Sequence, residues 1–98
     1  MGAASFLLVG HGSRRHLCSA SHGAGRARSR FSMSRRGADR SPEALGLVGV
    51  DCVTLQEERL VEEAPAAYKD IGPVIDCQVD AGIASVVARM RPVLTFKG

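Results

Sequence analysis

The chain has 98 residues, a formal net charge of +3, one tyrosine, three phenylalanines and no tryptophan. A chain of this length buries only about 60–68% of the surface that it exposes when unfolded, so we expect a modest core. No apolar stretch approaches the ~20 residues of a membrane span, which argues against a membrane protein. The three cysteines are widely spaced and form no CxxC pair. This spacing indicates neither a zinc site nor a disulfide framework, and we expect reduced thiols in the cytoplasm.

Positive charge is concentrated in the first part of the chain. Residues 1–40 carry eight arginines and one acidic residue, whereas residues 41–98 carry five basic and nine acidic residues. The guanidinium fork matches pairs of phosphate oxygens, so a region this rich in arginine favours a polyanionic partner. Nucleic acid and nucleotide phosphates are the two partners of this kind that we consider.

Four elements are predicted in the first half of the chain. The apolar run Ala4–Val9 predicts a buried strand, and His16–Ser19 predicts a second short strand that would close a hairpin with it. Residues Gly23–Arg36 have helical character after their glycines. Ser41 followed by proline predicts the N-cap of a brief helix that ends at Leu47.

The second half alternates between strand-like and helical patterns. The β-branched run Val50–Leu55 predicts a strand, and Val93–Phe96 predicts the last one. The acidic segment Glu57–Val74 is expected to be extended or loop, with a short turn at Ala66–Asp70. Apolar residues at helical spacing predict the longest helix over Pro73–Met90. We therefore expect an α+β fold with three or four short strands and two helices.

The stretch Ser19–Arg30, SASHGAGRARSR, carries the strongest chemical pattern. Glycines beside His22 would let backbone N–H groups approach a ligand, and a helix that starts there would favour an anion. On such a helix Arg26 and Arg30 share one face and are the better phosphate ligands. A neutral imidazole is a competent nucleophile toward phosphorus, so His22 is a candidate for a covalent bond to phosphate. The alternative is a histidine that makes only a structural hydrogen bond in a turn.

A metal site is the other chemistry that the histidines suggest. The spacings from His11 through His16 and Cys18 to His22 fit no standard zinc pattern. We therefore expect no metal site built within this chain.

Four stretches of the chain, SHGAGRARSR, MGAASFLLVG, EEAPAAYKDI and DAGIASVVARMRPV, together resemble motifs of a known family, the RtcB-type RNA-splicing ligases. The stretch SHGAGRARSR resembles the family signature HGAGR-x-x-SR, MGAASFLLVG resembles the strand MGTASYVLVG, and EEAPAAYKDI resembles the loop EEAPGAYKDI. The stretch DAGIASVVARMRPV and the closing Lys-Gly resemble the last helix and the end of the family. The resemblance implies that residues 1–98 form the C-terminal part of an RtcB-like ligase domain, a fragment of a larger α+β fold. Residues 31–50 match the family poorly.

The resemblance also implies roles for individual residues. His22 matches the histidine that becomes guanylylated, and Arg26 and Arg30 match arginines near nucleotide or RNA phosphates. Binding of the guanine nucleotide would involve residues from four separate motifs: Ser5, His22, Gly23, Ala24, Gly25, Tyr68 and Lys97. The manganese ligands of the family lie upstream of these motifs, so the resemblance implies that Mn²⁺ would be held by a missing N-terminal part of the ligase.

The activity implied is a GTP-dependent RNA ligase that joins RNA 3′-phosphate or 2′,3′-cyclic phosphate ends to 5′-hydroxyl ends. It would act through a GMP-histidine intermediate, on tRNA halves or broken RNA ends, and this chain alone would be inactive. Two alternatives stay open. One is a small basic module that binds nucleic acid through residues 14–40, and the other is a non-functional remnant of the ligase.

Overall fold

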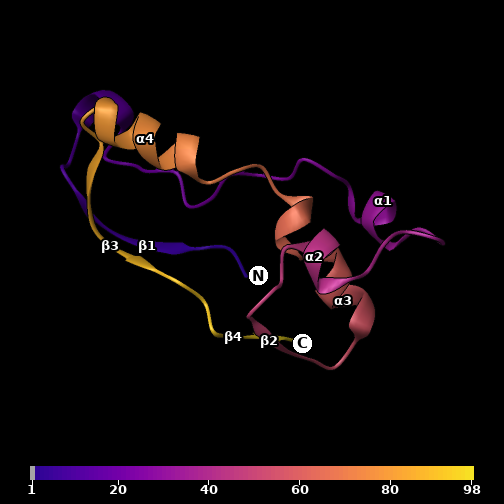
Figure 1. Cartoon of the computed structure of the whole chain (residues 1–98). Helices are drawn as coiled ribbons and strands as arrows, with labels where there is room; N and C mark the ends of the chain where they lie inside the picture. Colours follow the sequence, from indigo (N-terminus) through magenta and orange to yellow (C-terminus); the bar gives the residue numbers. More distant parts are fainter. Residues whose placement is uncertain (1) are drawn as a thin grey trace. The chain divides into compact units, whose positions relative to one another are not determined.

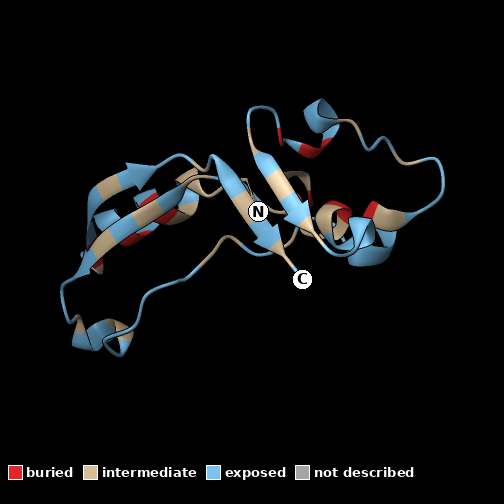
Figure 2. Cartoon of the chain, turned by 90° about the horizontal axis from the view of Figure 1, so that it is seen from below, coloured by how far each residue is buried: buried red, intermediate tan, exposed pale blue. Residues whose placement is uncertain are grey.

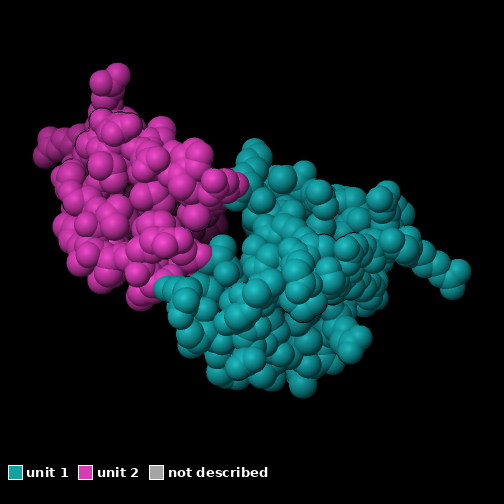
Figure 3. Space-filling view, in the orientation of Figure 1, with its two compact units in different colours: residues 1–3, 25–69, 91–98 teal, residues 4–24, 70–90 magenta. Residues whose placement is uncertain are grey.

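The structure is a computed structural model that describes residues 2–98, and it divides into two compact units (Figure 3). Unit 2 comprises residues 4–24 and 70–90, and unit 1 comprises the other described residues. Each unit is therefore assembled from segments that are distant in the sequence. The α+β class predicted from the sequence is confirmed: residues 2–98 form four short strands in two small sheets, and they form four α-helices rather than the two expected.

Unit 2 is a two-stranded antiparallel sheet with one helix. Strand β1 (Ser5–Gly10) pairs with β3 (Ala84–Met90), so that Ser5 lies opposite Met90 and Gly10 opposite Ala84 (Figure 1). The register shifts between Leu7 and Leu8, which is the mark of a β-bulge. Helix α4 (Gly72–Asp80) precedes β3 directly and contacts it.

The long helix predicted over 73–90 is wrong in its second half. Helix α4 ends at Asp80, and Gly82 follows with a φ of +70° in the left-handed region, which an L side chain rarely adopts. Beyond that glycine, the run Ala84–Met90 pairs with β1 as a strand. Its apolar residues fit the helical period, but its adjacent valines also favour a strand, and the tertiary pairing decides between the two.

The predicted hairpin at 16–19 is also wrong. Residues Arg14–His16 form a short 3₁₀-helix, η1, and Leu17 and Cys18 have φ angles of 54° and 51°. These angles are incompatible with a strand. Strand β1 therefore takes its partner from the other end of the sequence.

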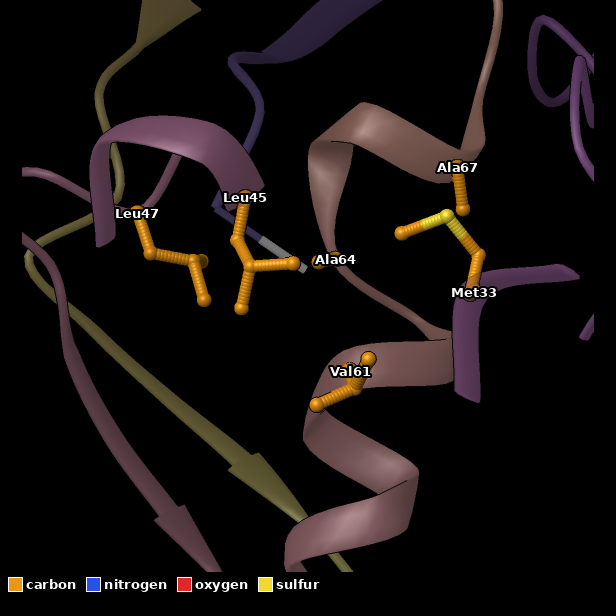
Figure 4. Packing of buried hydrophobic residues seen from close by; sticks show 6 residues of the cluster. All are labelled: Met33, Leu45, Leu47, Val61, Ala64 and Ala67. Carbon is orange, nitrogen blue, oxygen red and sulfur yellow. The ribbon is translucent and has the colours of Figure 1, made fainter. Parts of the chain in front are cut away.

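Unit 1 contains three short helices, α1 (Arg30–Ser34), α2 (Pro42–Leu45) and α3 (Glu57–Glu62), and the 3₁₀-helix η2 (Pro65–Ala67). Its sheet pairs β2 (Asp51–Thr54) with β4 (Leu94–Lys97) in parallel. The buried cluster between these elements consists of Met33, Leu45, Leu47, Val61, Ala64 and Ala67 (Figure 4). Small side chains at its centre let η2 lie close to the helices.

Of the other predicted elements, some are confirmed and some are wrong. The strands at 4–9, 50–55 and 93–96 are confirmed, and so is the N-cap at Ser41, whose hydroxyl accepts from the Ala44 N–H. The extended segment predicted at 57–74 is wrong because it contains α3, η2 and the start of α4. The helix expected over 23–36 is reduced to α1, whose N-cap is Ser29.

Burial is limited throughout. Red residues in Figure 2 are few and lie mostly at the helices. Strands β2 and β4 alternate between exposed and intermediate residues, β1 does so over its first four residues, and β3 is mostly exposed after Ala84. Among the exposed apolar side chains are Leu7, Val9 and Met90 of the first sheet and Phe96 of the second. Both sheets therefore leave apolar side chains open to solvent.

The end of α4 gives a direct test of the fold. We expect Gly82→Ala to lower the free energy of unfolding of the chain by about 1–2 kcal/mol, because alanine is strained at this left-handed φ. A Cβ would meet no atom within 4 Å there, so backbone strain alone would act. Gly10→Ala is the matched control, since its Cβ also meets nothing and its φ is not left-handed. Urea denaturation followed by circular dichroism measures both, and equal stability of the two variants would contradict the helix end described here.

Candidate active site

The segment around His22 is an extended loop rather than a helix. Residues 21–25 have no regular secondary structure, and α1 begins only at Arg30. The expected helix N-terminus beside His22 is therefore wrong. The loop is drawn out because the Ala27 and Arg28 N–H groups both donate to the Ala67 carbonyl, at 2.9 and 3.1 Å. These bonds replace the intrahelical ones.

His22 is exposed, and its imidazole has no hydrogen bond or ion pair with any residue in the described range 2–98. The structural hydrogen bond that was the alternative for this histidine is thus not made within the described chain. An unpartnered imidazole keeps a lone pair available to an incoming electrophile.

His22 borders a cavity of about 430 Å³ in unit 2. Ser5, at the start of β1, lines the same cavity, although the two residues come from different sequence motifs. The other walls are mainly apolar: Ala4, Phe6, Leu8, Ile71 and Ile75, with Ser21 beside His22. A mostly apolar cavity of this size with a few polar groups is typical of a small-ligand site.

The backbone next to His22 offers donors to a ligand. From His22 to Gly25, no backbone N–H donates a hydrogen bond to a residue of the described chain. A Cβ placed on Gly23 or Gly25 would meet nothing within 4 Å, and Gly25 has a φ of +76°. The predicted glycine loop, which includes Ala24, is therefore open, and its N–H groups are accessible to phosphate oxygens.

Three predicted residues meet in unit 1 around a residue that sequence reasoning missed, Glu63. Tyr68 donates a short hydrogen bond from its hydroxyl to the Glu63 carboxylate, and Arg30 donates to the same carboxylate from Nε and Nη2, each at 3.2 Å. The Arg26 Nη1 atom lies 3.6 Å from Glu63 Oε1. The guanidinium carbon of Arg26 lies over the Tyr68 ring, 5.0 Å from the ring centre. The side chain of Glu63 is only 13% exposed, so these partners compensate for its partial burial.

Arg26 is held on three sides. Its Nε donates to the Arg28 carbonyl at 3.0 Å, its Nη2 to the Glu62 carbonyl at 2.6 Å and its Nη1 to the Tyr68 hydroxyl at 3.2 Å. The prediction that Arg26 binds phosphate stays a prediction. In this structure its guanidinium joins the loop after His22 to the segment 62–68.

The Tyr68 hydrogen bond is the main cause that lowers the pKa of Glu63, and Arg30 and Arg26 lower it further. The same hydrogen bond raises the pKa of Tyr68. Both shifts favour a charged carboxylate beside a neutral phenol. The network therefore persists through the neutral pH range.

The predicted site residues fall in both units. Ser5, His22, Gly23 and Ala24 belong to unit 2, whereas Gly25, the two arginines, Tyr68 and Lys97 belong to unit 1. Lys97 lies in β4 opposite Thr54, and its side chain is half-buried. The structure thus brings Ser5 to His22, and it brings Tyr68 to Arg26 and Arg30.

Within residues 2–98, no group of three or more His, Cys, Asp and Glu side chains is placed to hold a metal ion. In the same range, no helix has the length and apolarity needed to cross a membrane.

Comparison with known proteins identifies the family. The family model described as tRNA-splicing ligase RtcB matches residues 1–98. The chain belongs to the RtcB family. It is 42% identical over 101 residues to the tRNA-splicing ligase RtcB of Thermococcus kodakarensis, covering all of this chain and 21% of that protein.

Other relatives give the same result. The RtcB of Nanoarchaeum equitans is 38% identical, and the RNA-splicing ligase RtcB homolog 1 of Entamoeba histolytica is 34% identical, each over the whole chain. The chain spans about a fifth of the length of these RtcB relatives and matches their C-terminal portion. The resemblance read from the sequence motifs is therefore confirmed at the level of the family.

Sequence reasoning missed Glu63 and Gln78. Glu63 lies inside the motif EEAPAAYKDI, within the acidic segment Glu57–Val74. The available signal was this acidic charge, which could pair with the arginine-rich residues 1–40. Gln78 is buried on α4, seven residues after Ile71 and three after Ile75. A polar residue on an otherwise apolar helical stripe was the signal there.

The Glu63 network predicts a pH-dependent stability. We expect Glu63→Gln to lower the free energy of unfolding by about 1–3 kcal/mol near pH 7, because charge-assisted hydrogen bonds are lost. The folded-state pKa of Glu63 lies below 4.5, so its contribution is present above about pH 4.5 and is lost as the pH falls through the lowered value. The two proteins should therefore converge in acid.

Urea titrations of both proteins across this pH range measure the difference. Glu58→Gln is the matched control, because Glu58 is 59% exposed in its ion pair with Arg40 and should contribute little. A Glu63→Gln effect that is constant with pH would contradict the network.

Proposed function

We propose that this chain carries the histidine nucleophile and part of the guanine-nucleotide pocket of a GTP-dependent RNA ligase. The ligase joins RNA 3′-phosphate or 2′,3′-cyclic phosphate ends to 5′-hydroxyl ends. Its substrates are tRNA halves or broken RNA ends. The activity requires the complete ligase, and this chain corresponds to 21% of the length of the Thermococcus kodakarensis relative.

The observation that carries the proposal is the shared cavity of Ser5 and His22. These residues are separated by 17 positions and belong to two motifs that resemble the family independently. The cavity offers apolar walls to a flat base and has an unpartnered imidazole at its border, and Ser5 of β1 also lines it. Membership of the RtcB family supports the same assignment.

In the first proposed step, a lone-pair nitrogen of neutral His22 forms a bond to the α-phosphorus of GTP. The bond from that phosphorus to the bridging oxygen breaks, and pyrophosphate leaves with the electron pair. The proton on the other ring nitrogen is retained. Negative charge on the phosphoryl oxygens is stabilised by fixed donors, for which the open N–H groups of Gly23, Ala24 and Gly25 are the candidates.

In the later steps GMP passes from His22 to an RNA 3′-phosphate, and the His22–phosphorus bond breaks. A 5′-hydroxyl then attacks the activated phosphate, loses its proton and displaces GMP. The exposed arginines Arg14, Arg15, Arg28, Arg35 and Arg36 have no side-chain partner within residues 2–98, and they offer charge to the RNA backbone. Tyr68 and Lys97 remain predicted contacts of the guanine nucleotide.

The implied Mn²⁺ does not fit the residues described here, because no suitable group of ligands exists among residues 2–98. We derive no step through the metal. Its ligands remain a prediction for a part of the ligase that this chain does not span.

A chimera provides the test of this function. The 98-residue chain would replace the matching portion of the Thermococcus kodakarensis RtcB, and RNA joining would be measured with GTP and Mn²⁺. We expect the chimera to join 3′-phosphate to 5′-hydroxyl RNA. His22→Ala should lower joining by at least about 10³-fold, because the covalent intermediate cannot form.

His16→Ala is the matched control, since His16 lies in η1 and, within residues 2–98, its imidazole hydrogen-bonds only to the Ser13 hydroxyl. Joining by the His22→Ala chimera at the rate of the unsubstituted chimera would overturn the assignment of the nucleophile. A chimera that melts cooperatively yet joins no RNA, beside an active parent enzyme, would favour the non-functional remnant.

A further inference from the structure

Gln78 is the one buried polar side chain within residues 2–98, with 5% of its surface exposed. It lies on α4, and its amide faces the backbone of Ser21, the residue immediately before His22. Burying an amide costs free energy unless its polar atoms find partners. The partners that Gln78 finds are both on one residue of the loop.

The two contacts fix the orientation of the amide. The Ser21 N–H can only donate, so Gln78 Oε1 accepts from it at 2.9 Å. Gln78 Nε2 in turn donates to the Ser21 carbonyl at 3.5 Å, which is the longer and weaker contact. One side chain therefore restrains the peptide groups on both sides of the Ser21 Cα.

The restraint reaches the nucleophile through a short path. The Ser21 hydroxyl donates to the Gly23 carbonyl at 2.9 Å, so the backbone is held on both sides of His22. Helix α4 also supplies Ile75 to the wall of the His22 cavity. One helix thus forms a wall of the cavity and anchors the loop that presents the imidazole to it.

We propose that Gln78 is a positioning residue for nucleotide transfer, which holds His22 at the cavity through the Ser21 backbone. This inference rests on the proposed function of His22. Gln78 does not line the His22 cavity, so it acts on the orientation of the nucleophile rather than on nucleotide binding. Displacements near 1 Å of a reacting group are enough to slow a reaction by ~10²-fold.

The first test uses the 98-residue chain and asks whether the restraint exists. In hydrogen-exchange NMR we expect the Ser21 amide to be protected, and we expect Gln78→Met to remove that protection. Methionine has a similar length and no acceptor of comparable strength. Asp76→Asn is the matched control, because Asp76 is exposed on the same helix. An unprotected Ser21 amide in the unsubstituted chain would overturn the proposal, whatever the function of His22.

The second test measures covalent labelling of the chimera with GTP that carries an α-phosphorus label. We expect Gln78→Met to lower the labelling rate at saturating GTP by at least about tenfold, while the GTP concentration at half-maximal rate changes less than about threefold. Asp76→Asn should label normally. Normal labelling by Gln78→Met would overturn the proposal. Absence of labelling in the unsubstituted chimera would instead be a failure of the proposed function.

Gln78→Glu separates positioning from a general loss of stability. A protonated glutamic acid can accept from the Ser21 N–H and donate to the Ser21 carbonyl, as glutamine does, whereas the carboxylate repels that carbonyl. Burial favours the protonated form. We therefore expect the labelling rate of Gln78→Glu, relative to the unsubstituted chimera, to rise as the pH falls from about 8 to about 6. A ratio that does not change with pH would contradict positioning through this hydrogen-bond pair.

Discussion

The pairing of β1 with β3 is the constraint on which unit 2 depends. It joins the beginning of the chain to residues 84–90 and brings the inner side chains of β1 to α4. Without this pairing, β1 would have no partner within the described chain, because the segment after it forms η1 with two left-handed residues. The cavity beside His22 exists because β1 supplies one wall and α4 supplies another.

The Glu63 network has a comparable role in unit 1. It links the motif SHGAGRARSR to the motif EEAPAAYKDI, since Arg26 and Arg30 of the first bind Glu63 of the second and Arg26 also bonds to Tyr68. Arg26, for which the resemblance implies phosphate binding, thus also makes structural contacts within unit 1. Arg26 makes three hydrogen bonds within the unit, whereas Arg28 leaves its guanidinium without a partner in the described chain.

Sequence reasoning succeeded where the signal is local. The proline after Ser41 and the β-branched run at 50–55 specify their own structures, and both are present. It failed where a segment distant in the sequence determines the secondary structure. Residues 84–90 fit a helical period as well as a strand, and only β1 selects the strand. The helix expected after Gly23 is prevented because the Ala27 and Arg28 N–H groups donate to the Ala67 carbonyl. No local sequence pattern predicts these hydrogen bonds.

In the candidate site, too, local sequence patterns indicated some residues, whereas others depend on contacts between distant segments. The motif singled out His22, and the resemblance named Ser5 with it. Both residues line one cavity, and their roles in nucleotide binding stay predictions. Gln78 was not predicted, because its role depends on the loop that packs against α4. The role of a buried polar side chain can be inferred only when its hydrogen-bond partners are known.

The central claim is that the nucleotide becomes bonded to His22, and peptide mapping of the GTP-labelled chimera by mass spectrometry tests it most directly. At alkaline pH, which preserves a phosphorus–nitrogen bond to imidazole, the account predicts one added GMP on the peptide that contains His22, with fragments that place it on that side chain. An added GMP on Lys97, or on any other residue, would contradict the account.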